Sequence, residues 1–168
     1  MSIDTTNTAQ AETPVAKTVV SFEELATMAG ADLGHTDWMT IDQARINAFA
    51  AAADDDQWIH TDPVRAADGP FGTTIAHGYL TLSLVIPLFA QLLDATGVAN
   101  KINYGLNKVR FPAPVTVDSK IRLAARLAEV TEVPGGLQIA LDALVEIEGS
   151  PKPACIAQPV FRFYAEQA

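Results

Sequence analysis

Cysteine and long apolar runs are scarce in this sequence of 168 residues. Its one cysteine, Cys155, has no partner for an internal disulfide. The N-terminal stretch MSIDTTNTAQAETPVAK lacks the basic start and apolar run of a signal peptide. The longest apolar run, 79–93, covers 15 residues, fewer than the roughly 20 that a membrane-spanning helix needs. These absences predict a cytoplasmic protein with no membrane partner.

Positive charge is also scarce. There are 11 Lys and Arg against 20 Asp and Glu, a net charge of -9, whereas nucleic-acid binding needs clustered cations. We therefore expect no nucleic-acid partner. Six of the cations nevertheless share the window 101–126, in which Asp118 is the one acid. They are Lys101, Lys108, Arg110, Lys120, Arg122 and Arg126.

Motifs for metals, nucleotides and nucleophilic serine are missing as well. The three histidines and one cysteine do not have the spacing of CxxC or HExxH sites. The sequence contains neither GxGxxG nor a Walker loop. Ser83 lies within an apolar run without the elbow motif of serine hydrolases. The sequence therefore predicts neither a bound metal nor a resident cofactor.

The composition is that of a globular protein with a substantial core. Hydrophobic residues make up 49% of the chain, and the mean hydropathy is +0.16. The length suits one domain. Residues 1–17 show no periodicity, so we expect a flexible tail there and a single domain over 18–168.

Helix signals begin directly after the expected tail. Ser21 and Glu24 form a capping box in front of a short helix expected over 22–29. Thr40 and Gln43 offer a second capping box, in front of an amphipathic helix that ends at the aspartate run DDD.

The middle of the chain combines a loop with a long apolar helix. The segment 54–77 is expected to be mostly loop with one short helix, which Asp62 and Pro63 start. From Gly78 to Asp94 the pattern is apolar on every face, and Gly97 suits the residue after a helix. Such a helix must be wrapped by other structure, with Pro87 as a point where it kinks.

The second half has the alternation of strands. The expected strands are 102–111, 115–131, 137–147 and 154–164. Alternation slips near Leu127 and Ala128, as a bulge would produce, and Pro159 implies an edge position or a bulge. Consecutive strands without intervening helices indicate an α+β fold, with an antiparallel sheet around the long helix.

The stretch ADDDQWIH, 53–60, places three carboxylates at the C-terminal end of the expected helix. They face the negative pole of the helix dipole, which costs a few tenths of a kcal/mol each. An aspartate run is usually a solvated loop, but an unfavourable local choice is also typical of a functional site.

A second stretch, PFGTTIAHGYLTLSL, contains the start of the apolar helix at Gly78. The N–H of this glycine is a free donor at a positive helix end, where it could stabilise an oxygen that gains negative charge. Tight packing around the start of the helix would explain the glycine equally well.

Together, the two stretches carry a resemblance to a known family. DDDQWIHTDPVRAADGPFGTTIAHGYLTLSL resembles the hydratase motif of the MaoC-like, or (R)-specific enoyl-CoA hydratase, family. NYGLNKVRFPAPV resembles the strand that follows the central helix in that family. The resemblance implies a hotdog fold, a homodimer or higher homo-oligomer, and reversible hydration of trans-2-enoyl-CoA to (R)-3-hydroxyacyl-CoA. Coenzyme A would then belong to the substrate and would not be a separate cofactor.

Carried over by position, the family motif assigns the catalytic pair to Asp55 and His60. Asp54 and Asp56 become solvated neighbours. Hydration needs a proton taken from water and a proton delivered to carbon, and a carboxylate with an imidazole can do both. Which of the two moves which proton stays open. The Gly78 N–H is assigned to the thioester oxygen.

Further residues are candidates for supporting roles. Gln57 keeps an amide where the family often has Asn, but Trp58 departs from its Pro, which leaves the substrate subclass open. For His77 a structural role at the helix entrance is favoured over catalysis. The basic residues Lys108, Arg110, Lys120, Arg122 and Arg126 are candidates for contacts with coenzyme A phosphates, and a solvated outer sheet face is the equal alternative.

Two other functions remain open. One is an acyl-CoA thioesterase on the same fold, because a fold does not fix a function. The other is a subunit that binds acyl thioesters without turnover. The presence of both Asp55 and His60 favours the hydratase.

Overall fold

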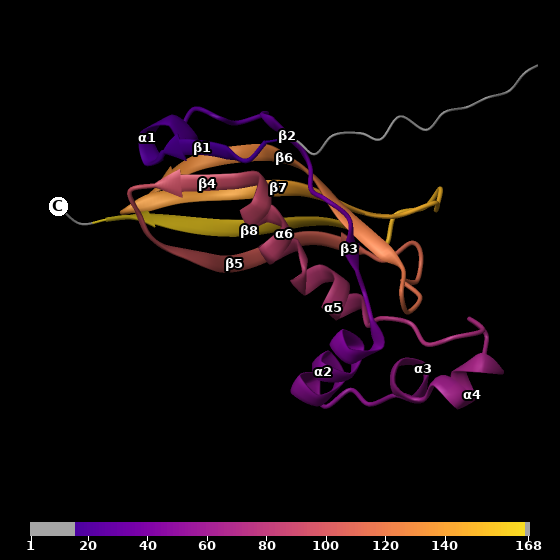
Figure 1. Ribbon diagram of the computed structural model, residues 1–168. Coiled ribbons are helices and arrows are strands. Elements are labelled where there is room, and N and C mark those ends of the chain that lie inside the picture. The colour runs from indigo at the N-terminus through magenta and orange to yellow at the C-terminus, as the bar shows by residue number, and fades with distance from the viewer. Residues whose placement is uncertain (1–15, 167–168) are drawn as a thin grey trace, which may run out of the picture.

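An antiparallel sheet lies against a pair of helices in the computed structural model, which describes residues 16–166 (Figure 1). The strands are β1 (Thr18–Ser21), β2 (Asp32–His35), β3 (Met39–Thr40), β4 (Leu93–Thr96), β5 (Val98–Arg110), β6 (Lys120–Val133), β7 (Gly136–Ile147) and β8 (Cys155–Ala165). The helices are α1 (Phe22–Leu25), α2 (Gln43–Ala53), α3 (Trp58–Thr61), α4 (Pro63–Ala67), α5 (Gly78–Ser83) and α6 (Val85–Leu92). Of the tail expected over 1–17, all but residues 16 and 17 lies outside this range.

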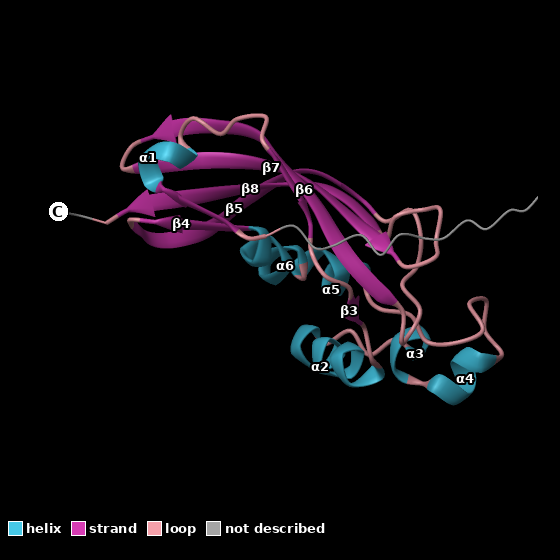
Figure 2. Cartoon of the chain, turned by 45° about the horizontal axis from the view of Figure 1, so that its top comes forward, coloured by secondary structure: helices cyan, strands magenta, loops and turns pink. Residues whose placement is uncertain are grey.

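The main sheet has the order β2-β6-β7-β8-β5, and β3 pairs with β6 beyond β2. All these pairs are antiparallel. The alternation of β7 is as expected, because Leu137, Ile139, Leu141, Ala143 and Val145 are all buried. Figure 2 shows α5 and α6 beneath this sheet, and α2, α3 and α4 gathered at one end beyond α5. The α+β class and the antiparallel sheet are therefore confirmed.

The central helix is shorter than predicted and interrupted. It divides at Leu84 into α5 and α6, and the chain then enters β4, which pairs in parallel with β1. The break follows from Pro87, whose ring has no N–H and crowds the carbonyl four residues earlier, at Ser83. The helix ends at Leu92, so the prediction of a helix to Asp94 was wrong. Gly97, with φ +73°, follows a strand and not a helix. Within residues 16–166, no helix is long and apolar enough to span a bilayer.

The helix pair is covered by the sheet on one side only. Leu88 and Leu92 are buried in the core, whereas Tyr79 is 71% exposed and Ile86 is 43% exposed. The expectation of a helix wrapped on every side was therefore wrong for the single chain. The exposed helix face borders β5, an outer strand of the main sheet that keeps almost all of its side chains exposed.

The strand irregularities were located correctly. The register of β6 against β7 shifts between Leu127 and Glu129, as the predicted bulge requires. Pro159 lies in β8, between β7 and β5, beside a shift in the β5 register. Of the two alternatives for Pro159, the bulge is correct. The strand predicted from 115 begins only at Lys120, because Asp118 adopts a left-handed turn with φ 64°.

The helix caps were predicted with mixed success. The Ser21–Glu24 capping box is present, but α1 ends at Leu25 and not at 29. For α2, the cap is Asp42, whose side chain accepts from the Arg45 N–H. The predicted Thr40–Gln43 box was therefore wrong.

The segment 54–77 holds two short helices, α3 and α4, where one was expected. Asp62 caps α4 and Pro63 is its first residue, as predicted.

Candidate active site

The aspartate run lies where α2 ends. Asp54 is the C-cap and takes the left-handed conformation, with φ 52°, which an aspartate tolerates better than most residues. The N–H groups of Asp54 and Asp55 both donate to the Ala50 carbonyl. The sharp turn leaves the Asp55 side chain exposed, and no hydrogen bond or ion pair within residues 16–166 engages its carboxylate. Asp54 thus shapes the turn, and Asp55 presents a free carboxylate.

His60 lies in α3 and is 8% exposed. Its Nδ1 lies 2.6 Å from the Ile75 carbonyl oxygen. Since a carbonyl only accepts, Nδ1 carries the hydrogen, and neutral His60 keeps a lone pair on Nε2. Burial is the main cause that lowers the pKa of His60. The bond to Ile75 opposes it, nearby His77 adds to the lowering, and the Asp55 charge partly offsets it. His60 is therefore suited to act as a neutral base.

His77 contacts both members of the predicted pair. It is the N-cap residue of α5 and is 2% exposed. Its Nε2 donates to the Asp55 carbonyl oxygen at 2.9 Å. Its ring stacks on His60, with centroids 3.7 Å apart and planes 25° apart, and lies 5.0 Å from the Phe49 ring. Among the described residues its Nδ1 has no hydrogen-bond partner. His77 thus fixes the backbone of Asp55 and the ring of His60 in relation to each other.

The side chains of Asp55, His60 and His77 converge. One carboxylate or ring-nitrogen atom from each lies within 4.8 Å of the other two, a separation that one water molecule bridges. These groups can also bind metal ions. His60 donates through Nδ1 and His77 through Nε2, so each ring keeps one nitrogen, His60 Nε2 and His77 Nδ1, that is hydrogen-bonded to no described residue. The set suits acid–base chemistry, and the absence of a metal stays a prediction.

Gly78 opens α5 directly after His77, and its N–H makes no hydrogen bond among the described residues. The Phe111 ring packs against it so closely that an added Cβ would lie 3.0 Å from a ring carbon. Close packing therefore accounts for the glycine, and its N–H keeps a hydrogen-bonding capacity that no described residue uses.

The side chain of Gln57, a predicted support, caps nothing. Gln57 precedes α3, and its exposed side chain makes no cap hydrogen bond. Its carbonyl accepts from the N–H groups of His60 and Thr61. Its contribution to the site within the described chain is thus made by the backbone.

Sequence reasoning missed Gln43 and Thr74. The Gln43 amide donates to the His60 carbonyl at 2.7 Å and accepts from the Thr74 hydroxyl at 2.5 Å. These contacts join positions 17 and 31 residues apart. No local signal could have predicted them, because they depend on how α2 and α3 pack.

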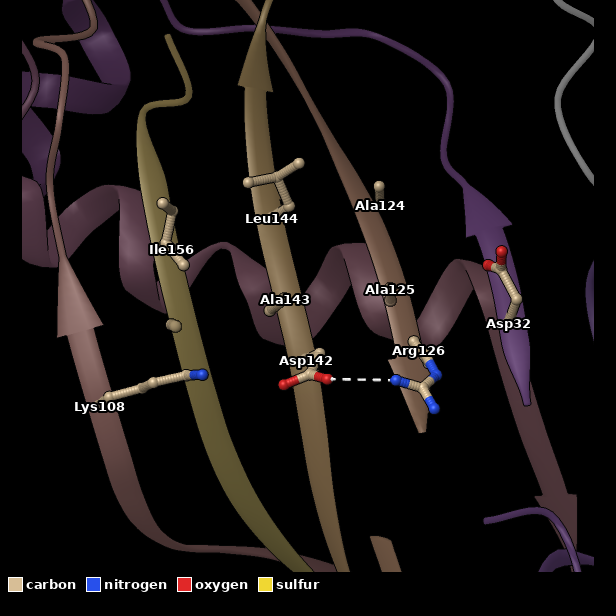
Figure 3. A pocket seen from close by; sticks show the side chains of 10 residues that line it. Asp32, Lys108, Ala124, Ala125, Arg126, Asp142, Ala143, Leu144 and Ile156 are labelled. Atoms are coloured by element: carbon tan, nitrogen blue, oxygen red, sulfur yellow. Dashed lines mark ion pairs between the residues drawn. The ribbon is translucent and has the colours of Figure 1, made fainter. Parts of the chain in front are cut away.

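The predicted cations of β6 share a face, as expected, but it is the outer face of the sheet. Each lies beside an acid, with separations of 3.2 Å for Lys120–Glu148, 2.6 Å for Arg122–Glu146 and 3.9 Å for Arg126–Asp142. Figure 3 shows Lys108, Asp142 and Arg126 in this order across a groove of this face, with a helix behind the strands. The arrangement supports the alternative of a solvated outer face for these cations.

Arg110 is placed differently from the cations of β6. It is the last residue of β5 and immediately precedes Phe111, whose ring packs on Gly78. Among the predicted phosphate contacts, Arg110 is therefore the one whose neighbour in the sequence packs on the start of α5.

Comparisons with known proteins identify the family of this chain. The model of the MaoC like domain matches residues 24–141, which include Asp55, His60, His77 and Gly78. The chain belongs to the MaoC-like dehydratase family. A relative in Mycobacterium tuberculosis, 3-hydroxyacyl-thioester dehydratase Z, is 51% identical over 89% of this chain and 99% of its own. Nodulation protein N of Rhizobium meliloti is 40% identical over 82% of this chain and 88% of its own.

Solved structures confirm the hotdog fold for this MaoC-like chain. An (R)-hydratase from A. caviae aligns with a TM-score of 0.65 and 26% identity, covering 79% of this chain and 94% of the other. R-hydratase PhaJ1 from Pseudomonas aeruginosa has a TM-score of 0.67 at 22% identity, covering 82% and 83%; at this identity the likeness concerns the fold alone.

Proposed function

We propose that the protein catalyses the reversible hydration of trans-2-enoyl-CoA to (R)-3-hydroxyacyl-CoA. The observation that carries the proposal is the convergence of a free Asp55 carboxylate with His60, whose Nδ1 is fixed by the Ile75 carbonyl. The family adds support, because a relative that is 51% identical is named a 3-hydroxyacyl-thioester dehydratase. Dehydration of the hydroxy thioester is the same reaction in reverse.

The pair handles the two protons of the reaction. Water oxygen forms a bond to C3, one water proton passes to the pair, and the pair delivers a proton to C2, so the net change is addition of one water. An ionised Asp55 and the Nε2 of neutral His60 both accept, so the proton that the pair delivers to C2 is one that it has taken from water. Such positioned groups typically contribute about 10²- to 10⁴-fold.

The thioester oxygen becomes more negative as water adds. We assign its stabilisation to the Gly78 N–H, which stands at the start of α5 next to the stacked histidines. One preorganised donor of this kind is worth on the order of 10²- to 10³-fold. The acyl chain is assigned to an apolar groove of about 280 Å³ that begins at Tyr79, the next residue, and runs between the helices and β5 and β8.

A homodimer or higher homo-oligomer is part of the proposal. Among the strands that the structure describes, β5 pairs with β8 alone. Apolar side chains stay exposed on it and on the adjoining helix face: Tyr79, Ile86, Ile102, Tyr104 and Leu106. A second copy would cover them and close the groove. Among the proposed phosphate contacts, Arg110 is the one that adjoins Phe111, whose ring packs on Gly78. The cytoplasmic location stays a prediction.

The proposal is tested by following the loss of the conjugated enoyl absorbance of crotonyl-CoA and longer trans-2-enoyl-CoAs, with the chirality of the product determined. We expect the (R) alcohol. Release of free thiol from saturated acyl-CoA without hydration would indicate a thioesterase. Binding of acyl-CoA without either reaction would indicate a non-catalytic subunit. An (S) product would contradict the proposal.

A further inference from the structure

Gln43 joins three segments around His60. It lies in the first turn of α2, half-buried. Its Nε2 donates to the His60 carbonyl at 2.7 Å, and its Oε1 accepts from the hydroxyl of Thr74 at 2.5 Å. Because the His60 carbonyl can only accept, the amide orientation is fixed. Thr74 is fully buried, so without Gln43 its hydroxyl would lack this partner in the interior, a costly arrangement.

The contacts of Gln43 lie on both sides of the bond that orients the imidazole. The His60 Nδ1–H donates to the Ile75 carbonyl at 2.6 Å, and the Ile75 N–H donates to the Ile59 carbonyl at 3.0 Å. Thr74 immediately precedes Ile75. One end of the Gln43 amide therefore holds the main chain of His60. The other end holds Thr74, next to Ile75, whose carbonyl accepts the hydrogen bond from the imidazole ring.

We propose that Gln43 is a positioning residue that, through Thr74, keeps His60 in the Nδ1–H tautomer and leaves Nε2 as the acceptor for water. Among the described residues, no hydrogen bond joins Gln43 to the imidazole ring, and Gln43 takes no part in proton transfer. The effect on turnover rests on the proposed hydratase function, whereas the effect on the tautomer does not depend on it.

The first test is Gln43→Leu, which keeps the approximate size of the side chain and removes its hydrogen bonds to His60, Thr74 and Asn47. We expect kcat for crotonyl-CoA to fall by about 10- to 100-fold, as small misplacements of catalytic groups do, with KM changed by less than about 3-fold. Nitrogen-15 NMR of the ring at a pH where His60 is neutral should change from a pure Nδ1–H tautomer to a mixture. A lower Tm with unchanged tautomer and kcat would overturn the proposal, because it would show a structural role alone.

A matched pair at Thr74 separates hydrogen bonding from packing, and it carries the test if Gln43→Leu does not fold. Thr74→Ser keeps the hydroxyl and loses a methyl group, whereas Thr74→Val keeps the shape and loses the hydroxyl. We expect Thr74→Ser to retain kcat and the His60 tautomer, and Thr74→Val to lose kcat and mix the tautomers. The opposite order, with activity following shape, would contradict the proposal.

Asn47→Ala is the control. The Gln43 amide also donates to Asn47 Oδ1 at 2.8 Å, but Asn47 is exposed and is hydrogen-bonded to neither His60 nor Thr74. This variant should leave kcat within about 2-fold. If wild-type protein failed to hydrate enoyl-CoA, the tautomers of Gln43→Leu and Thr74→Val would still decide the role of Gln43. Unchanged tautomers in both variants would overturn the proposal by themselves.

Discussion

Polar side chains on the two sides of the sheet are held in opposite ways. On the outer face, cations of β6 meet acids of β7 and its turn through side chains, as in Arg122–Glu146 and Lys120–Glu148. At the helical end, the side chains are held by main-chain carbonyls: His60 by Ile75 and His77 by Asp55. Side-chain pairs satisfy each other, whereas groups held by the backbone keep one end free. The comparison teaches why the helical end, and not the more highly charged face, can carry chemistry.

Removing the imidazole of His60 should have the largest effect on activity. We expect His60→Ala to lower kcat/KM for crotonyl-CoA by about 10²- to 10⁴-fold, because a positioned acid–base group is lost. Arg122→Leu, on the opposite face, is the comparison and should retain turnover. Steady-state kinetics measure both. An equal loss of kcat/KM in both variants would show that lower protein stability, and not the loss of the imidazole, reduces the activity.

Gly78→Ala should affect both stability and turnover. The new Cβ would lie 3.0 Å from the Phe111 ring, so we expect a loss of about 1–3 kcal/mol in the free energy of unfolding from overpacking. Displacement of the Gly78 N–H should also lower kcat. Urea unfolding and kinetics of Gly78→Ala and of Gly78→Ala with Phe111→Leu test this. If the smaller side chain restored no stability, the packing account of Gly78 would be wrong.

The acid limb of the pH profile should reflect the burial of His60. Burial lowers its pKa from the ordinary 6.5, so His60 stays a neutral base below that pH. We expect the kcat/KM midpoint below pH 6.5. The unfolded chain takes up this proton at about 6.5, so the stability due to neutral His60 is complete above that pH and is lost as pH falls through the lower folded value. A midpoint above 6.5 would contradict this assignment.

The smallest effect is expected on the outer face. Arg126→Ala removes an exposed contact of 3.9 Å with Asp142, so the free energy of unfolding should fall by at most about 1 kcal/mol. The KM for crotonyl-CoA should not change. Arg110→Ala is the sharper comparison, with a KM raised by about 3- to 10-fold if the guanidinium meets a phosphate. A larger rise in KM for Arg126→Ala than for Arg110→Ala would contradict the choice of Arg110 as the phosphate contact.

Much of the sheet could be predicted, because the alternation in 137–147 and the slip after Leu127 are local patterns. The end of the central helix could not be predicted: an apolar run does not distinguish a helix from the buried β4 that follows it. The exposure of one helix face could not be predicted either. An apolar pattern on every side indicates burial, but it does not show whether the same chain or a second copy would bury the helix.

The candidate site was predicted as far as its motif extends. Asp55, His60, His77 and Gly78 lie within one continuous stretch, so their approximate convergence follows from the family resemblance. The supporting contacts were not predictable, because Gln43 and Thr74 reach His60 only through the packing of α2. The same limit applies to the α2 cap, where Thr40 and Asp42 both fit the pattern and only the backbone selects Asp42.

The most direct measurement compares crotonyl-CoA hydration by Asp55→Asn and Asp56→Asn. Both changes remove one exposed carboxylate from the same turn, so their effects on charge and stability should be similar. We predict a loss of about 10²-fold or more in kcat for Asp55→Asn and near wild-type turnover for Asp56→Asn. Near-normal hydration by Asp55→Asn would contradict the assignment of Asp55 and His60 as the pair that activates water.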